Sequence, residues 1–206
     1  MIHEVVITSG KKNKAPIGIY FRAKSEGFCN STLRSDKEKE VVLHLFEGSH
    51  TYENLKNDDY FVVNVCHPID IAEAVLDDED DYGYLDWNGK ELPYLKNAYK
   101  IFVVKINKRK FITKRDNFGE SKLMVVNGEI VFEKELNNII TPYNRADGLL
   151  VEMAVIYSRL NNEKIIMKND DREAMKKDME KYFKIIKKVG SKKHVDLAKR
   201  FMELIK

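Results

Sequence analysis

The segment from Leu43 to Val65 constrains the fold of this chain most, because its pattern predicts a strand, a turn, a helix and a second strand in close succession. The first strand is apolar and ends at Phe46, a Glu-Gly-Ser turn follows, the helix begins at His50, and the second strand begins at Tyr60. A helix that starts directly after a polar turn leaves backbone N–H groups without carbonyl partners at one point. An anionic group can accept hydrogen bonds there.

Two interpretations of the hydroxyls of Ser49 and Thr51 remain open at this point. Either hydroxyl can cap the helix by accepting a hydrogen bond from an N–H of the first turn. Alternatively, both hydroxyls bind an anion together with the free N–H groups, and His50 and Asn54 belong to the same segment. The helix dipole contributes only about 0.3 to 1 kcal/mol to binding an exposed anion. A binding site therefore requires hydroxyls, amides and an apolar wall together.

The composition is that of a soluble globular protein. Of the 206 residues, 43% are hydrophobic and 33% are charged, and a chain of this length can bury a sizeable core. No apolar run reaches the length of a membrane span and the N-terminus lacks a secretory signal, so we expect a cytoplasmic location. The two cysteines, Cys29 and Cys66, are too few for a disulfide framework. The net charge of +3 does not favour nucleic acid as a partner.

The N-terminal residues predict a hairpin, because 5–8 and 15–21 have strand composition and a polar, glycine-containing link joins them. Pro16 lacks a backbone donor and so belongs at a strand start or a sheet edge. Gly18 inside the second strand indicates that another group approaches the backbone closely. A bend of the sheet with nothing bound explains Gly18 equally well.

About six strands precede residue 140, which suits a small closed barrel of antiparallel strands. The last two lie at 99–114 and 123–133, and Asn127-Gly128 is a strong signal for a tight turn. The chain contains no Gly-x-Gly-x-x-Gly and no Walker motif, so nothing supports a Rossmann or P-loop fold.

The segment 69–98 interrupts these strands with a short helical stretch, an acidic run at 77–81 and a loop rich in aromatic residues. The aromatic side chains are Tyr82, Tyr84, Trp87 and Tyr94. Such a loop can form a lid that controls access of a substrate. It can equally be a satellite cluster that packs onto the barrel.

Three histidines, His44, His50 and His67, fall in one region beside Cys66. Their spacing matches no zinc pattern with paired ligands a few residues apart, so we expect no metal site.

The composition changes near Thr141-Pro142, and three helices are predicted after it. They begin near Arg145, Asp170 and Ser191, each with apolar residues at helical spacing. The lysines lie mostly between these apolar positions, as on a solvated helix face. We therefore expect a barrel at 1–140 and a helical subdomain at 141–206, a fold that is mainly β with α.

The runs 49–55 and 60–65 resemble a signature of the flavin reductase-like proteins, Ser-x-Thr-x-x-Asn-Ile/Leu followed by Phe-Val-Val-Asn. Those proteins belong to the FMN-binding split-barrel superfamily. The resemblance implies that FMN is the cofactor and that the hydroxyls and helix start of the Phe46–Asn54 segment hold its phosphate. It also implies that Pro16, Ile17 and Gly18 lie beside the isoalloxazine ring, and that two copies form a homodimer.

Further strings, among them Asn144-Arg145-Ala146 and Tyr157-Ser158-Arg159-Leu160, are similar to an uncharacterised archaeal family of the same superfamily, in which helices follow the barrel. The chain departs from the flavin reductase pattern where Lys39-Glu40-Val41 replaces a Pro-Pro pair.

The resemblance favours an FMN-dependent oxidoreductase that accepts hydride from NAD(P)H or another donor. A non-catalytic flavin carrier or sensor is the alternative, and a cofactor-free structural module is a third. No catalytic residue is assigned, because the sequence shows no nucleophile–base pair.

Overall fold

The structure is a computed structural model that describes residues 2–23, 39–76, 81–116, 119–137, 144–162 and 167–205. Cys29 and most of the acidic run at 77–81 lie outside these ranges. Six strands close into an antiparallel barrel in the order β1-β2-β3-β8-β7-β4. They are β1 (His3–Ser9), β2 (Asn13–Ala23), β3 (Lys39–Phe46), β4 (Tyr60–Val65), β7 (Lys100–Asp116) and β8 (Gly119–Glu135). The predicted split barrel is confirmed.

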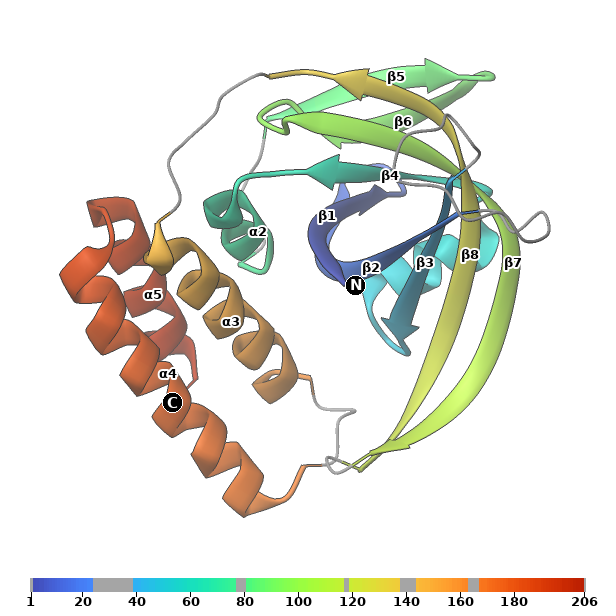
Figure 1. Cartoon of the computed structure of the whole chain (residues 1–206). Helices are drawn as coiled ribbons and strands as arrows, with labels where there is room; N and C mark the ends of the chain where they lie inside the picture. The colour runs from blue at the N-terminus through green and yellow to red at the C-terminus, as the bar shows by residue number, and fades with distance from the viewer. Residues whose placement is uncertain are drawn as a thin grey trace.

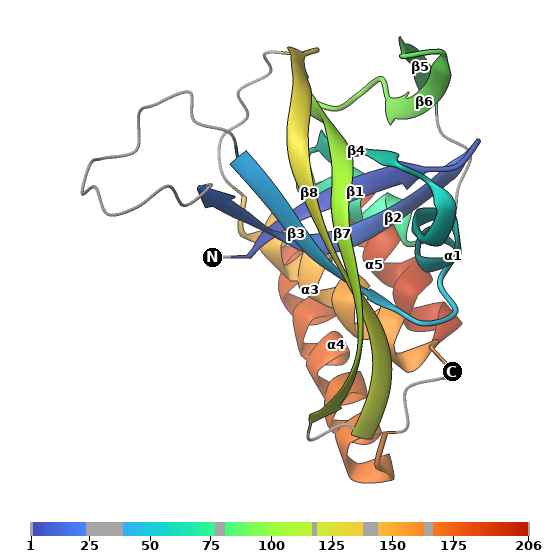
Figure 2. The same ribbon diagram turned by 90° about the vertical axis from the view of Figure 1, so that its right-hand side faces the viewer.

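The barrel interior is filled by alternate apolar side chains of its strands, as period-two patterning requires. Ile7, Ile19, Leu43, Phe61 and Met124 are among the completely buried members of this core. Helix α1 (His50–Asn57) follows β3 and closes one end of the barrel, where Tyr52 and Leu55 join the same core. The long β7–β8 ribbon runs down one side of the barrel and extends beyond it (Figure 2).

The prediction of a tight turn at Asn127-Gly128 was wrong. Gly128 lies inside β8, where it pairs with Val41 of β3 and Ile106 of β7 next to an irregularity in the β7–β8 register. A Cβ atom at this position would lie 2.8 Å from the backbone oxygen of Lys105. The glycine therefore permits a close approach of two strands rather than a reversal of the chain.

The aromatic segment forms a second hairpin, β5 (Tyr82–Trp87) and β6 (Lys90–Leu95), instead of the expected loop. Asn88 and Gly89 connect the strands with φ angles of 52° and 75°, the positive values that a two-residue hairpin turn requires. The hairpin packs on the outside of the barrel, where the Trp87 and Phe132 rings lie 5.3 Å apart. The segment is thus a satellite cluster on the barrel.

Asn64 of β4 attaches this hairpin to the barrel from a fully buried position. Its side-chain oxygen accepts the Leu95 N–H at 2.8 Å, and its Nδ2 donates to the Val6 carbonyl at 3.1 Å and to Thr8 Oγ1 at 3.0 Å. The asparagine that ends the Phe-Val-Val-Asn run is therefore structural.

A layer of helices lies beside the barrel, as predicted for the C-terminal part, and Figure 1 shows α2 between that layer and the barrel. The layer consists of α3 (Arg145–Leu160), α4 (Asn169–Val189) and α5 (Lys192–Leu204), and α2 spans Pro68–Ala74. Their shared core contains Leu150, Met153, Met179, Ile186 and Phe201. Within the described ranges, none of the helices combines the length and apolar character that crossing a membrane requires.

A buried carboxylate, that of Asp147 in the first turn of α3, lies where α3 meets α5 and the start of α2. His194 of α5 accepts the Ser191 N–H at its Nδ1, so its Nε2 carries the proton and donates to Asp147 Oδ1 at 2.8 Å. His67, the residue that caps α2, places its Nε2 3.9 Å from the same oxygen. Asp147 thus joins α3 to α5 and lies close to the start of α2.

Glu4 on the outer side of β1 interacts with α3 across the space between the barrel and the helical layer. Burial raises the pKa of Glu4 above its ordinary value of 4.5, the carboxylate of Glu152 raises this pKa further, and Arg159 opposes both effects. The folded protein therefore holds the Glu4 proton more tightly than the unfolded chain does.

Replacing Asn64 by Ala should lower the free energy of unfolding by about 2 to 4 kcal/mol, because two buried backbone groups lose their partners and a cavity remains. The matched control is Asn97→Ala, since Asn97 is exposed and donates to Asp70 Oδ1 at 2.9 Å. Denaturant unfolding of both variants measures the difference. Equal small losses would show that Asn64 does not hold the hairpin.

Replacing Glu4 by Gln should stabilise the protein more at pH 7 than at pH 4. The stability that Glu4 contributes is present below its unfolded pKa and is lost as the pH rises through its raised folded pKa, whereas glutamine does not ionise. Thermal unfolding at both pH values tests this, with the exposed Glu91→Gln as the control. A larger gain at pH 4 would contradict it.

Candidate functional site

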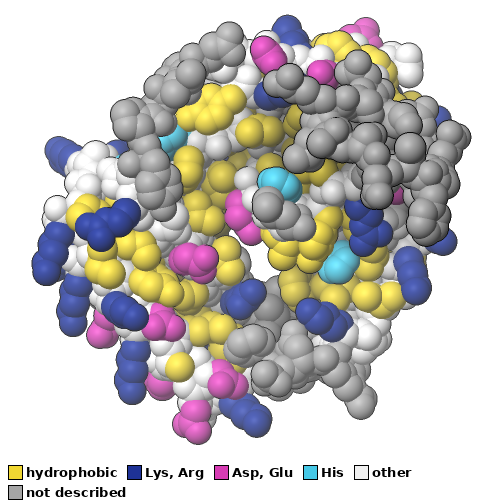
Figure 3. Space-filling model, in the orientation of Figure 1, with side chains coloured by type: hydrophobic (Ala, Val, Ile, Leu, Met, Phe, Trp, Pro, Cys, Tyr) yellow, Lys and Arg dark blue, Asp and Glu magenta, His cyan; other side chains and the backbone are white. Residues whose placement is uncertain are grey.

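A pocket of about 940 Å³ opens between the barrel and the helical layer. Figure 3 shows the molecule hollowed between these two parts. Four pieces of chain line the pocket: the β1–β2 hairpin, the start of α1, the end of α2 and the end of α3. The lining residues are Lys12, Asn13, Lys14, Ala15, Pro16, Glu47, Gly48, Ser49, His50, Thr51, Asn54, Ala74, Val75, Tyr157, Ser158, Asn161 and Asn162.

The start of α1 contributes both a cap and free amides, so each interpretation of its hydroxyls holds in part. Ser49 is the cap residue: its Oγ accepts the Tyr52 N–H at 3.2 Å and donates to the Phe46 carbonyl at 3.1 Å. His50 and Thr51 occupy the first two helical positions, and amides there have no carbonyl partner within the helix. Both residues line the pocket, which gives it hydrogen-bond donors and the positive end of a helix dipole.

Thr51 is buried and belongs to a hydrogen-bonded group that joins α1 to the β1–β2 hairpin. Its Oγ1 accepts a hydrogen bond from Asn13 Nδ2 at 2.8 Å, and Asn13 Nδ2 also donates to Ser9 Oγ at 3.0 Å. Asn54 Nδ2 donates to the same Ser9 oxygen at 3.1 Å. The two chain segments that line this side of the pocket therefore hold each other in place.

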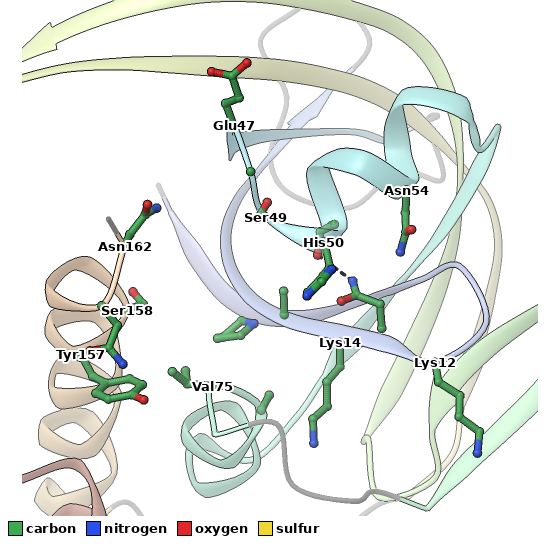
Figure 4. Close-up of a pocket in the computed structure, with 17 residues that line it drawn as sticks. Lys12, Lys14, Glu47, Ser49, His50, Asn54, Val75, Tyr157, Ser158 and Asn162 are labelled. Atoms are coloured by element: carbon green, nitrogen blue, oxygen red, sulfur yellow. Dashed lines mark hydrogen bonds between the residues drawn. The ribbon is translucent and has the colours of Figure 1, made fainter. Parts of the chain in front are cut away.

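The β1–β2 hairpin adds two cationic side chains. Lys12 is exposed and Lys14 is largely buried, and both line the pocket across from the end of α3, as Figure 4 shows. Glu47 is the acidic residue among the lining residues, and its carboxylate points away from the lysines. The side of the pocket formed by the β1–β2 hairpin therefore attracts anions.

The end of α3 forms the opposite wall. Tyr157, Ser158 and Asn162 lie there, and Figure 4 shows the Tyr157 hydroxyl directed toward the end of α2. The Tyr157 ring packs against Phe201 of α5, with 5.2 Å between the ring centroids. Together with Pro16 and Val75, this ring supplies the apolar surface of the pocket.

The pocket brings together five of the eight residues assigned from sequence: Pro16, Ser49, His50, Thr51 and Asn54. The other three lie outside its lining. Phe46, which is 41% exposed, ends β3 just before the turn, and Ile17 packs against the barrel core.

Gly18 has no space beside it, because a Cβ atom there would lie 2.8 Å from the Ile2 side chain and 3.2 Å from the Glu4 carboxylate. The close approach that its sequence position indicated is made by side chains of the N-terminal segment.

The predicted lid does not cover this pocket, since no residue of the β5–β6 hairpin is among its lining residues. The histidines also separate: His44 is exposed on β3, His67 caps α2, and His50 lines the pocket.

Lys12, Asn13 and Lys14 also line the pocket and were not predicted from the sequence, although they lie directly before Ala15-Pro16 and form a visibly basic link. The residues of α3 were not predicted either, because nothing in their helical pattern shows that the C-terminal turn faces the barrel.

Comparisons with known proteins cover nearly the whole chain. Residues 3–137 match the family model described as the N-terminal domain of a protein of unknown function, DUF447, and residues 144–206 match the model of the same family's remaining part. The uncharacterised protein MJ1453 of Methanocaldococcus jannaschii is 52% identical over 201 residues, which cover 96% of this chain and 95% of that protein.

A solved structure of low sequence identity shares the fold. The FMN-bound protein MM1853 of Methanosarcina mazei, also of DUF447, superposes with a TM-score of 0.73 at 20% identity over 98% of this chain and 94% of that one. A flavin reductase domain protein of Arthrobacter sp. FB24 gives a TM-score of 0.49 at 13% identity, over 66% of this chain and 79% of that one. On the family models and the 52% identical relative, this chain belongs to the DUF447 family.

Proposed function

We propose that this protein binds FMN in the pocket between the barrel and the helical layer, with the phosphate at the start of α1. The observation that carries the proposal is that helix amides, the Thr51 hydroxyl and two lysines line one pocket of about 940 Å³. A phosphate offers the acceptor oxygens and the negative charge that such a lining accommodates. The FMN-bound relative MM1853, which shares the fold and the family, supports the assignment.

The other end of the pocket suits an aromatic ring system. Pro16, Val75 and Tyr157 offer apolar surface. Ser158 Oγ donates to the Val155 carbonyl at 2.8 Å and can still accept from a ring N–H, while the side-chain amide of Asn161 suits a ring carbonyl. Because Tyr157 belongs to α3, the helical subdomain takes part in binding the flavin.

The reaction class that fits this pocket is an FMN-dependent oxidoreduction with a hydride donor such as NADH, NADPH or a deazaflavin. Bound FMN supplies the redox chemistry, and the protein supplies placement, charge and exclusion of water. Without a Rossmann-type site the donor binds loosely at the open side of the pocket. A flavin carrier or sensor binds FMN in the same way but does not pass electrons from these donors. If no flavin binds, the remaining hypothesis is a structural module without a cofactor.

We further propose a cytoplasmic homodimer. Phe46 and Phe111 expose 41% and 60% of their surface on the barrel side of the molecule, and a second copy can cover such apolar groups. Sedimentation at micromolar concentration should give about twice the chain mass of 24.1 kDa. A species of the chain mass alone would contradict the dimer.

Purified protein should be yellow or should quench the fluorescence of added FMN. Lys12→Ala should weaken FMN about 3- to 10-fold, because the pocket that attracts the phosphate loses one positive charge, and should leave riboflavin unchanged. Lys11→Ala is the matched control, since Lys11 is the exposed neighbour outside this pocket. The difference should shrink in high salt, where such charges are screened.

Colourless protein that leaves FMN fluorescence unaltered would remove the flavin proposal. Equal effects of the Lys11 and Lys12 variants would place the phosphate elsewhere.

Anaerobic mixing with NADH or NADPH separates the oxidoreductase from the carrier. The oxidoreductase should bleach the flavin band near 450 nm, roughly its usual position, within minutes. Trp87→Ala should not slow the bleaching, because the β5–β6 hairpin lies outside the pocket. A flavin band that persists with both nicotinamides and with a reduced deazaflavin would favour the carrier.

A further inference from the structure

We infer that Asn13 is a positioning residue that makes the pocket selective for a phosphorylated flavin over an unphosphorylated one. The inference rests on the proposed function and concerns one end of the same pocket. It follows from the directions of three hydrogen bonds and from one glycine.

Asn13 uses both of its side-chain N–H groups. Its Nδ2 donates to Ser9 Oγ at 3.0 Å and to Thr51 Oγ1 at 2.8 Å. Ser9 and Thr51 are 2% and 1% exposed, so water does not compete freely for these bonds. The amide of Asn13 is therefore held in one orientation.

The Thr51 hydroxyl can both donate and accept. Because an N–H of Asn13 already points at the oxygen, the hydroxyl hydrogen must turn away from Asn13. Thr51 lines the pocket next to the open amides at the start of α1. The hydroxyl thus presents a donor there, and a donor suits an ionised phosphate, whose oxygens only accept.

The same contacts also fix the position of the β1–β2 hairpin relative to α1. Gly10 turns the hairpin with a φ of 58°, and a Cβ atom there would lie 2.8 Å from Asn54 Nδ2, so the turn rests directly on α1. Asn54 and Asn13 both donate to Ser9 at the end of β1. Lys12 and Lys14 flank Asn13, and their ammonium groups are carried by this fixed segment.

A purely structural role of Asn13 predicts a different effect on FMN and riboflavin binding. If Asn13 only joined the hairpin to α1, its removal would loosen the whole pocket and weaken FMN and riboflavin to the same degree. The ratio of the two dissociation constants therefore distinguishes positioning of the phosphate donors from general support.

The test is a set of fluorescence titrations with FMN and with riboflavin. Asn13→Ala should weaken FMN by about tenfold or more, the usual effect of a misdirected hydrogen bond to a charged group, and riboflavin by no more than about twofold. Thr51→Val should give a similar loss of the FMN preference. In the double variant the two losses should not multiply, because both changes remove the same donor.

Asn97→Ala is the matched control, because it removes the side-chain amide of an exposed asparagine that lies outside the pocket lining. It should leave the ratio of FMN to riboflavin affinity within about twofold. Asn13→Asp is the second variant if Asn13→Ala does not fold. Its carboxylate only accepts, so the Thr51 hydroxyl must turn toward it, and the FMN preference should fall even in high salt.

Equal weakening of FMN and riboflavin by Asn13→Ala, or independent losses in the double variant, would overturn the inference while leaving FMN binding intact. Wild-type protein that binds neither flavin would instead overturn the proposed function.

Discussion

The buried carboxylate of Asp147 ties α3 to α5, and α3 forms one wall of the pocket. A carboxylate placed at 6% exposure is costly unless hydrogen bonds compensate for the lost water. Here the backbone N–H of Asn144 and the Nε2–H of His194 donate to it, and His67 lies 3.9 Å away on α2. Because α2 also contacts β1 and β2, the wall formed by α3 is held at a set distance from the barrel.

The barrel followed from the sequence because its signals are local. Strand composition placed all six barrel strands, and the polar turn after Phe46 placed the start of α1 at His50, where the structure has it. The two Asn-Gly pairs show the limit of such signals. Asn88-Gly89 makes a two-residue turn, whereas Asn127-Gly128 lies inside β8 because its glycine admits a neighbouring strand. The same dipeptide serves turn geometry in one place and close packing in the other.

The pocket was only half predictable, since its parts come from distant stretches of chain. The hydroxyls of Ser49 and Thr51 indicated a candidate anion site at the helix start, yet Asn13, which donates a hydrogen bond to Thr51, lies 38 residues earlier. Its role depends on which residues the closed barrel brings together. Tyr157 and Asn161 looked like ordinary positions of an amphipathic helix, and only the contact of α3 with α2 turns them toward the barrel.

A crystal structure of the protein with FMN would test this binding mode most directly. We expect the phosphate at the start of α1, within hydrogen-bond distance of Thr51 Oγ1 and the amide of His50, with the ring between Pro16 and Tyr157. A flavin bound on the outer face of the barrel, with its phosphate away from α1 and with this pocket empty, would contradict it.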